Sequence, residues 1–324
     1  MLRVRNPYHN IDESLNSVIV EAPASIANLG PGFDILAMAI DGFKDKVQIT
    51  IKPGSGRISI KAEGMKIPEN EDNVAYGVIR DAIERYSLSN VDFYVRIVKR
   101  VPLASGLGSS GATAAATAYG VSILAGLDLD VQDIIRLAGA GEAVAAGTPH
   151  YDNVSASILG GIVIIDPVSL KAYKVRSRIR FWIAVITPNI PRGYKKTRIA
   201  RSVLPREVEL HIHVKQSANI AKIIYALQAG DLEALGEAIS TDYIVEPNRA
   251  RLIPGYWELK KIALGNGALG FNIAGAGPSV FSIYRSKLDA QRVGKKMIEY
   301  LKSINIDASL YITRVSNQGV KVIG

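Results

Sequence analysis

A glycine-rich turn that leads directly into an alanine-rich stretch is the strongest constraint on how this chain can fold. The segment Pro102–Gly111 contains three glycines and three serines. A glycine turn that opens a helix presents unpaired backbone N–H groups at the positive end of the helix dipole, which suits an anion and above all phosphate. Glycine also lets the backbone approach a ligand closely, because it has no Cβ. We therefore predict a phosphate site at Pro102–Thr113, with a tight structural turn as the alternative.

Two well-known glycine patterns match this turn only in part. A P-loop requires a lysine after its last glycine, and none follows here. Gly106, Gly108 and Gly111 do have the spacing G-x-G-x-x-G, but in dinucleotide-binding enzymes an acidic residue ends a strand about 20 residues later. Asp128 and Asp130 lie near that distance, between a predicted helix end and the next helix start, where caps are expected. A dinucleotide-dependent oxidoreductase remains an alternative.

Composition limits the class of protein. The 324 residues suffice for two domains, and 48% of them are hydrophobic. The apolar runs fall short of the about 18 residues that cross a bilayer, so we expect no membrane partner. The absence of cysteine excludes disulfides, iron–sulfur clusters and thiolate zinc sites. We expect a cytoplasmic protein.

A net charge of +9 favours anionic ligands such as nucleotides and acidic substrates. The sparse aromatic residues do not alternate with basic ones, so we expect no nucleic-acid partner, and a nucleic-acid-binding protein is the weakest alternative. The densest basic cluster is either functional or a solvated loop. It consists of Arg192, Lys195, Lys196, Arg198, Arg201 and Arg206.

Strand-like and helix-like stretches alternate along the chain, which predicts an α+β architecture. Period-two patterns predict strands at 46–51, 57–61 and 93–98, and a continuous apolar run predicts a buried strand at 158–165. Apolar spacing and caps predict helices over 74–86, 110–125, 131–146, 219–228 and 232–239. Asp72 is the expected N-cap of the first of these helices, and Asn73 either caps a helix or lies in a loop that binds the nucleotide. Asp130 is the expected N-cap of the third helix, and Gly147 ends it.

Polar residues that could bind a ligand stand in three further places. Asn28 and Asp34 follow a predicted strand in a glycine/proline turn, where they either bind a substrate ammonium or satisfy the turn backbone. Glu142 lies on a helix among small residues; a buried carboxylate needs a partner, and Mg²⁺ bound to a nucleotide would serve. His150 and Asp152 lie in a segment expected to be irregular. Zinc would lack a third ligand there, which favours a general-base or substrate-orienting role.

A second glycine turn, Leu269–Phe281, lies between two predicted strands. It reads as a hairpin with a bulge, or as the opposite wall of an anion site.

Six segments, taken in order, resemble the GHMP kinase superfamily, and within it the homoserine kinases. The resemblance extends from about Val18 to Phe281. It departs at Gly111, where the family usually has alanine; we expect this exchange of one small residue for another to leave phosphate binding intact. Met1–Ser17 precede the family's usual start and receive no role. The segments are Ala22–Asp34, Pro102–Ala112, His150–Val154 followed by Leu159–Gly161, Thr197–Pro205, Glu246–Gly255 and Gly275–Ser279.

The resemblance implies two α+β domains with the site between them. Residues 1–176 would form an ATP-binding domain like a domain of a ribosomal small-subunit protein, and residues 177–324 a ferredoxin-like domain. The implied reaction is phosphorylation of L-homoserine by ATP with Mg²⁺, giving O-phospho-L-homoserine, a step toward threonine. Another small alcohol, shikimate or mevalonate, is the alternative substrate. The oligomeric state stays open, with a homodimer among the options.

The resemblance also implies individual roles. Ser110 and Glu142 would bind Mg²⁺, and Asp152, His150 and Asn28 would take part in catalysis, with Asp152 either a base or structural. The homoserine pocket would consist of Asn28, Asp34, His150, Thr197, Arg201, Arg249, Gly275 and Gly277. Guanidinium groups suit the substrate carboxylate because they bind it bidentately, and Asp34 suits the ammonium. The triphosphate would lie on Pro102, Leu103, Ala104, Ser105, Gly106, Leu107, Gly108, Ser109, Ser110, Gly111, Ala112 and Thr113.

Overall fold

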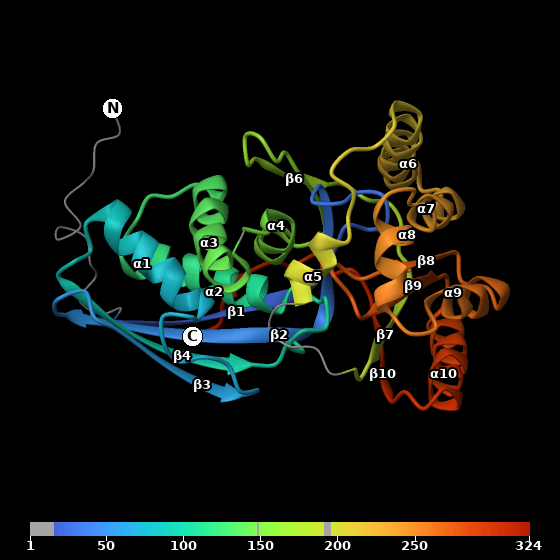
Figure 1. Cartoon of the computed structure of the whole chain (residues 1–324). Helices are drawn as coiled ribbons and strands as arrows, with labels where there is room; N and C mark the ends of the chain where they lie inside the picture. Colours follow the sequence, from blue (N-terminus) through green and yellow to red (C-terminus); the bar gives the residue numbers. More distant parts are fainter. Residues whose placement is uncertain (1–15, 148, 191–195) are drawn as a thin grey trace.

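The computed structural model describes residues 16–147, 149–190 and 196–324. Two sheets organise this part of the chain, each covered by helices (Figure 1). The larger sheet has seven strands in the order β11-β1-β2-β4-β3, with β5 paired to β2 and β6 paired to β5. These strands are β1 Ser17–Ala27, β2 Leu36–Pro53, β3 Ile58–Gly64, β4 Val91–Lys99, β5 Ile162–Ile165, β6 Ala172–Val175 and β11 Lys321–Val322.

Alternating side chains make β4 a strand with one buried face. Phe93, Val95 and Ile97 are buried in the core, whereas Tyr94 and Arg96 are exposed on the other face. This is the period-two pattern of a half-buried strand. It places Lys99, the last residue of β4, on the buried side, directly before the glycine turn.

Four helices lie on one side of the larger sheet, as Figure 1 shows; three of them contact the sheet, and α3 Val131–Ala146 packs on those three. The central helix α2 is buried on nearly all sides, with 12 of its 16 residues in the core. Its alanines and glycines allow strands and helices to approach it closely all round. The four helices are α1 Val74–Tyr86, α2 Ser109–Leu124, α3 Val131–Ala146 and α4 Tyr151–Leu159.

The predicted ends of the helices are correct where local caps mark them. Asp130 accepts hydrogen bonds from the first-turn amides of α3, and Gly147 ends that helix in a left-handed conformation, as predicted. For α1 the expected cap Asp72 is wrong, and the cap role considered for Asn73 is confirmed. Asn73, not Asp72, accepts the Ala75 N–H at 2.9 Å, because Asn73 is the residue directly before the first helical residue.

The predicted strand at 158–165 is also partly wrong. Its first two residues complete α4, and the strand β5 begins only at Ile162. Gly160 and Gly161 separate the two elements with φ of +65° and +75°, a conformation that glycine adopts readily. A continuous apolar run fits a buried helix end as well as a buried strand, so periodicity could not separate the two.

The second sheet is antiparallel, in the order β10-β7-β9-β8, with α9 and α10 packed against it. Its β8–β9 pair confirms the hairpin interpretation of the second glycine turn. Helices α6 and α7 pack on each other, and α5 lies between the two halves of the molecule (Figure 1). The elements are β7 Trp182–Pro188, α5 Lys196–Ser202, α6 Leu210–Ala229, α7 Leu232–Ile239, α8 Val245–Arg249 with the 3₁₀ turn Ala250–Leu252, α9 Tyr256–Gly265, β8 Gly270–Ile273, β9 Val280–Tyr284, α10 Lys287–Ser303 and β10 Ala308–Thr313.

The last residues of the chain return to the first sheet. Val315 bridges to Ile40, and β11 pairs antiparallel with β1. The tail therefore lies against the half of the molecule that precedes residue 176. The domain division at 176/177 stays a prediction. The C-terminal tail crosses this boundary, because it belongs to the second half in sequence but pairs with strands of the first. None of the helices in the described residues is long and apolar enough to cross a membrane.

Candidate active site

One cleft of about 770 Å³ brings together most of the residues that the sequence singled out. It is lined from both halves of the chain, so residues more than 200 positions apart face the same space. Predicted residues that line it are Asn28, Asp34, Leu103, Ala104, Ser105, Gly106, Gly108, Ser109, Ser110, Thr113, Glu142, His150, Asp152, Thr197, Arg201, Arg249 and Gly275. Pro102, Leu107, Gly111, Ala112 and Gly277 are not among its lining residues.

The glycine turn joins β4 to α2 and packs against the second glycine turn. Gly106 has φ +92°, and a Cβ there would lie 2.2 Å from the Ala274 carbonyl oxygen. The Ser279 N–H donates to the Ser105 carbonyl at 3.1 Å. Gly108, the N-cap of α2, has φ +63° and gives the helix no side-chain cap. The first-turn amides of α2 are therefore available for an anion in the cleft.

A carboxylate and an imidazole lie opposite that helix N-terminus. Glu142 on α3 is buried, with its Oε2 3.2 Å from His150 Nδ1. Burial acts to lower the pKa of His150, but the hydrogen bond and charge of Glu142 act against it and leave the pKa above its ordinary value. Glu142 Oε1 and His150 Nε2 are buried without a hydrogen-bond partner among the described residues.

The unpartnered Glu142 Oε1 indicates whether these residues could bind Mg²⁺. A buried carboxylate oxygen without a donor is a ligand that a hard cation would satisfy, and the Ser110 hydroxyl lines the same cleft. The described residues contain no cluster of three histidine, aspartate or glutamate side chains that could hold a metal alone. The donor set therefore fits a Mg²⁺ that arrives with phosphate oxygens, because Mg²⁺ commonly takes only one or two protein ligands in such sites.

Asp152 is fully buried in the first turn of α4. The segment expected to be irregular is thus helical from Tyr151, and His150 occupies the N-cap position. Burial raises the pKa of Asp152 to about 6, and the nearby negative charge of Asp34 acts in the same direction, while His150 lowers it. Such a carboxyl group can hold or release a proton near neutral pH.

Two arginines in the same cleft lie over one aromatic ring, and one of them pairs with an aspartate. Arg201 Nη2 donates to both Asp34 oxygens, at 3.0 and 2.8 Å. Arg249 is buried; its Nε and Nη1 donate to the carbonyls of Ala200 and Gly275, each at 3.0 Å. Burial lowers the pKa of Arg249 to about 10. Both guanidinium groups lie over the Phe33 ring, at 5.3 and 5.0 Å from its centre.

Asn28 connects its own glycine/proline turn to the second glycine turn. It has φ +75°, its Nδ2 donates to the Gly275 carbonyl at 3.1 Å, and its Oδ1 accepts the Asp34 N–H at 3.2 Å. These bonds agree with the interpretation that Asn28 satisfies the turn backbone. Its part in catalysis stays a prediction.

Several lining residues received no site role from the sequence, Phe33 and Lys99 among them. Phe33 directly precedes the predicted Asp34. Asn73, expected either in a nucleotide-binding loop or as a helix cap, lines the cleft and also caps α1. Lys99 directly follows the predicted strand 93–98, and the available signal was a charged residue on the buried side of that strand. Of the basic cluster, Arg192, Lys195 and the side chain of Lys196 lie outside what the structure describes. Arg198 and Arg206 are exposed, and among the described members only Arg201 lines the cleft.

Known proteins share this arrangement over nearly the whole chain. The model of the GHMP kinases N terminal domain matches residues 73–161, and that of the GHMP kinases C terminal domain matches residues 223–303. Homoserine kinase of Aeropyrum pernix is 36% identical over 307 residues, covering 94% of this chain and 97% of the relative. The chain belongs to the GHMP kinase family. Membership implies ATP as the phosphoryl donor, and the predicted family is confirmed.

Further relatives of this GHMP kinase lead to the same family assignment. Homoserine kinase of Pyrococcus furiosus is 37% identical, over 91% of this chain and 97% of its own. The crystal structure of homoserine kinase from Cytophaga hutchinsonii has a TM-score of 0.87 and 33% identity, covering 97% of this chain and 99% of that one. Mevalonate kinase of L. major, at 18% identity and a TM-score of 0.66, shares the fold. The predicted two-domain α+β fold is confirmed.

Proposed function

We propose that this GHMP kinase transfers the γ-phosphoryl group of ATP to the side-chain hydroxyl of L-homoserine. The products would be ADP and O-phospho-L-homoserine, a cytoplasmic step toward threonine. The names of the relatives support this substrate. The observation that carries the proposal is that one cleft joins a helix N-terminus without a side-chain cap to a pocket with both an aspartate and two arginines.

The pocket charges match an amino acid. Asp34 would bind the ammonium group, and Arg201 with Arg249 would bind the carboxylate. Without ligand, Arg201 and Asp34 bind each other. A zwitterionic amino acid carries an ammonium group for Asp34 and a carboxylate for Arg201. Its binding would therefore replace the Arg201–Asp34 ion pair with two ion pairs to the substrate. Shikimate and mevalonate carry a carboxylate but no ammonium, which would leave Asp34 without a cationic partner and disfavour them.

The remaining residues would position the reacting groups. The glycine turn and the first-turn amides of α2 would hold the triphosphate. Mg²⁺, held by Ser110 and Glu142, would neutralise phosphate charge when bound. Asp152 would accept the hydroxyl proton, because its raised pKa lies close to neutral pH. Phosphoryl transfer depends mainly on positioning, so a structural role for Asp152 is compatible with the same reaction.

A substrate panel tests the proposal. Purified protein with ATP and Mg²⁺ is offered homoserine, shikimate or mevalonate, and both ADP release and the ³¹P spectrum of the product are recorded. We expect ADP release with homoserine and a phosphomonoester on its side-chain oxygen. Turnover of shikimate or mevalonate, with none of homoserine, would overturn the substrate assignment.

Thermal unfolding separates the kinase from the dinucleotide-dependent alternative. A ligand that binds only the native state raises the unfolding midpoint, so ATP with Mg²⁺ should raise it and NAD should not. Stabilisation by NAD alone would contradict the proposed use of the glycine turn.

A further inference from the structure

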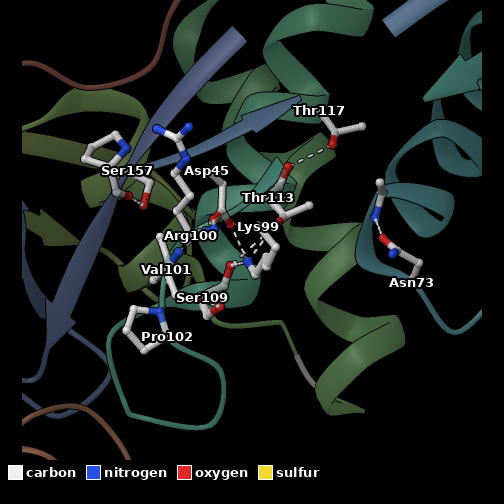
Figure 2. Close-up of polar contacts among 12 residues, drawn as sticks. Asp45, Asn73, Lys99, Arg100, Val101, Pro102, Ser109, Thr113, Thr117 and Ser157 are labelled. Carbon is white, nitrogen blue, oxygen red and sulfur yellow. Dashed lines mark hydrogen bonds and ion pairs between the residues drawn. The ribbon is translucent and has the colours of Figure 1, made fainter. Parts of the chain in front are cut away.

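A buried ion pair lies behind the glycine turn, outside the roles assigned so far. Lys99 at the end of β4 and Asp45 in β2 have side chains that are 2% and 0% exposed. The Lys99 ammonium donates to Asp45 Oδ2, to the Ser109 carbonyl, and to Thr113 Oγ1 at 2.8 Å (Figure 2). Two of these three acceptors belong to the first turns of α2.

The same aspartate holds the other end of the glycine turn. Its Oδ1 accepts the backbone N–H groups of Arg100 and Val101, each at 2.9 Å, as Figure 2 shows. Its Oδ2 accepts the Thr113 hydroxyl at 2.8 Å. Ser109 Oγ then donates to the Val101 carbonyl at 2.9 Å. Asp45 thus fixes where the chain leaves β4, and its lysine partner fixes where the chain enters α2.

Stability alone gives little reason for two charges here. Burial lowers the pKa of Lys99, while the charge and hydrogen bond of Asp45 oppose that shift. Removing two charges from water often costs more than their attraction returns, and an apolar pair of similar volume is frequently no less stable. An apolar pair could not bind the amides of Arg100 and Val101 or the carbonyl of Ser109.

We propose that Asp45 and Lys99 are positioning residues for the nucleotide. They set the distance between the two ends of the glycine turn, and thereby the direction in which the first-turn amides of α2 point into the cleft. Lys99 lines that cleft from behind the turn. This inference rests on the proposed function only in that the turn must bind ATP.

The test replaces both charges together, so that no unpaired buried charge unfolds the protein. In the double variant Asp45→Asn/Lys99→Met, we expect the Kd of MgATP, measured by isothermal titration calorimetry, to rise by about tenfold or more. The KM for ATP should rise with it, whereas the KM for homoserine should stay within about twofold. The single variant Lys99→Met should unfold more easily than the double variant, because it leaves Asp45 unpaired.

Thr117→Val is the matched control. The Thr117 hydroxyl is buried in the same helix, donates to the Thr113 carbonyl at 2.8 Å, and does not line the cleft. Its loss should lower the unfolding midpoint but leave the Kd of MgATP unchanged. If the double variant binds MgATP as tightly as the wild type, the positioning role is wrong and the proposed function stands. If the wild type itself does not bind MgATP, the proposed function fails first.

Discussion

The side chains of Asp34 and Arg201 are each about one-third exposed, 37% and 34%, whereas Arg249 is 3% exposed. An ion pair this accessible to water contributes little to stability. Arg249 instead holds two buried carbonyls, so it serves the fold as well as the pocket. The two arginines of the proposed carboxylate site should therefore differ in what their loss does.

We predict that Arg201→Met raises the KM for homoserine on the order of 10- to 100-fold, because a charged hydrogen bond to the substrate is lost. Its unfolding midpoint and its KM for ATP should stay close to those of the wild type. Arg249→Leu should raise the KM for homoserine and also lower the midpoint, since the Ala200 carbonyl loses its arginine donor and the Gly275 carbonyl keeps only the one from Asn28. For both variants, steady-state kinetics gives the KM values and thermal unfolding gives the midpoint. A rise in the KM for ATP instead would contradict the carboxylate assignment.

Asp152 should make stability depend on pH in a direction that can be worked out. Its pKa rises from 3.8 to about 6 on folding, so the folded state holds the proton more tightly than the unfolded chain. Stability is therefore lost as the pH rises from about 4 to about 6, and stays lower above that range. We predict that Asp152→Asn, measured without ligand, is more stable than the wild type by roughly 2–3 kcal/mol at pH 8.

The comparison across pH is the control for that prediction. Near pH 4 the wild-type carboxyl is protonated in the folded state, so the difference in the free energy of unfolding between the two proteins should vanish. Denaturant titrations at pH 4, 6 and 8 supply the values. An equal difference at all three pH values would mean that the effect does not come from the buried charge.

At the scale of elements, close helix packing brings Glu142 to His150. A Cβ on Gly141 would lie 2.5 Å from the Val74 carbonyl oxygen, and one on Gly139 would lie 2.3 Å from the Tyr151 ring. Helix α3 therefore approaches α1 and α4 more closely than alanine would allow. The small residues around Glu142 in the sequence indicated this packing, but not which helices would meet there.

We predict that Gly141→Ala lowers the free energy of unfolding by about 1–2 kcal/mol, because overpacking against backbone outweighs the gain in helix propensity. Turnover should fall as well, since α3 carries Glu142. Gly265→Ala is the matched control. Gly265 is the last residue of α9, and a Cβ there would meet nothing within 4 Å, so this variant should be as stable as the wild type or slightly more stable. Equal effects of both changes would rule out the packing argument.

In the whole molecule, the C-terminal tail, residues 315–324, is hydrogen-bonded to strands and a helix of the first half of the chain. The Ser316 N–H donates to the Ala39 carbonyl at 2.9 Å, and the Gly161 N–H donates to the Ser316 carbonyl at 2.6 Å. The Val320 N–H donates to the Ile158 carbonyl at 3.2 Å, at the end of α4. The tail thus supports the helix that carries Asp152, although it follows the second sheet in sequence.

We predict that deleting residues 315–324 lowers the free energy of unfolding by about 3–5 kcal/mol, through these lost backbone bonds and the exposed edge of β1. Activity should fall with it, because α4 loses its support. Deleting only 321–324 removes β11 and keeps the bonds of Ser316 and Val320, so it should cost less and retain turnover. Denaturant titration measures the free energy of unfolding of both deletion variants, and the ADP-release assay measures their activity. A longer deletion no more harmful than the shorter one would contradict this role of the tail.

Features that depend on neighbouring residues along the chain could be predicted from local signals. The start of α3 at Asp130 and its end at Gly147 follow from capping, and the turn before α2 follows from its glycines. Elements without a strong local signal went unpredicted, such as β10, or were misassigned, such as the end of α4, because a short apolar run fits either a strand or a helix. The resemblance of six segments also identified the family, which the comparisons confirm.

Which of these segments meet, and through which contacts, could be seen only in the three-dimensional structure. The bond from Lys99 to Ser109, the stacking of Arg201 and Arg249 on Phe33, and the return of the tail to β1 all join residues through space. Burial of Asp152 and the free oxygen of Glu142 likewise depend on what surrounds them. Capping and periodicity act over a few residues, whereas desolvation, ion pairing and close approach depend on neighbours that the chain order does not specify.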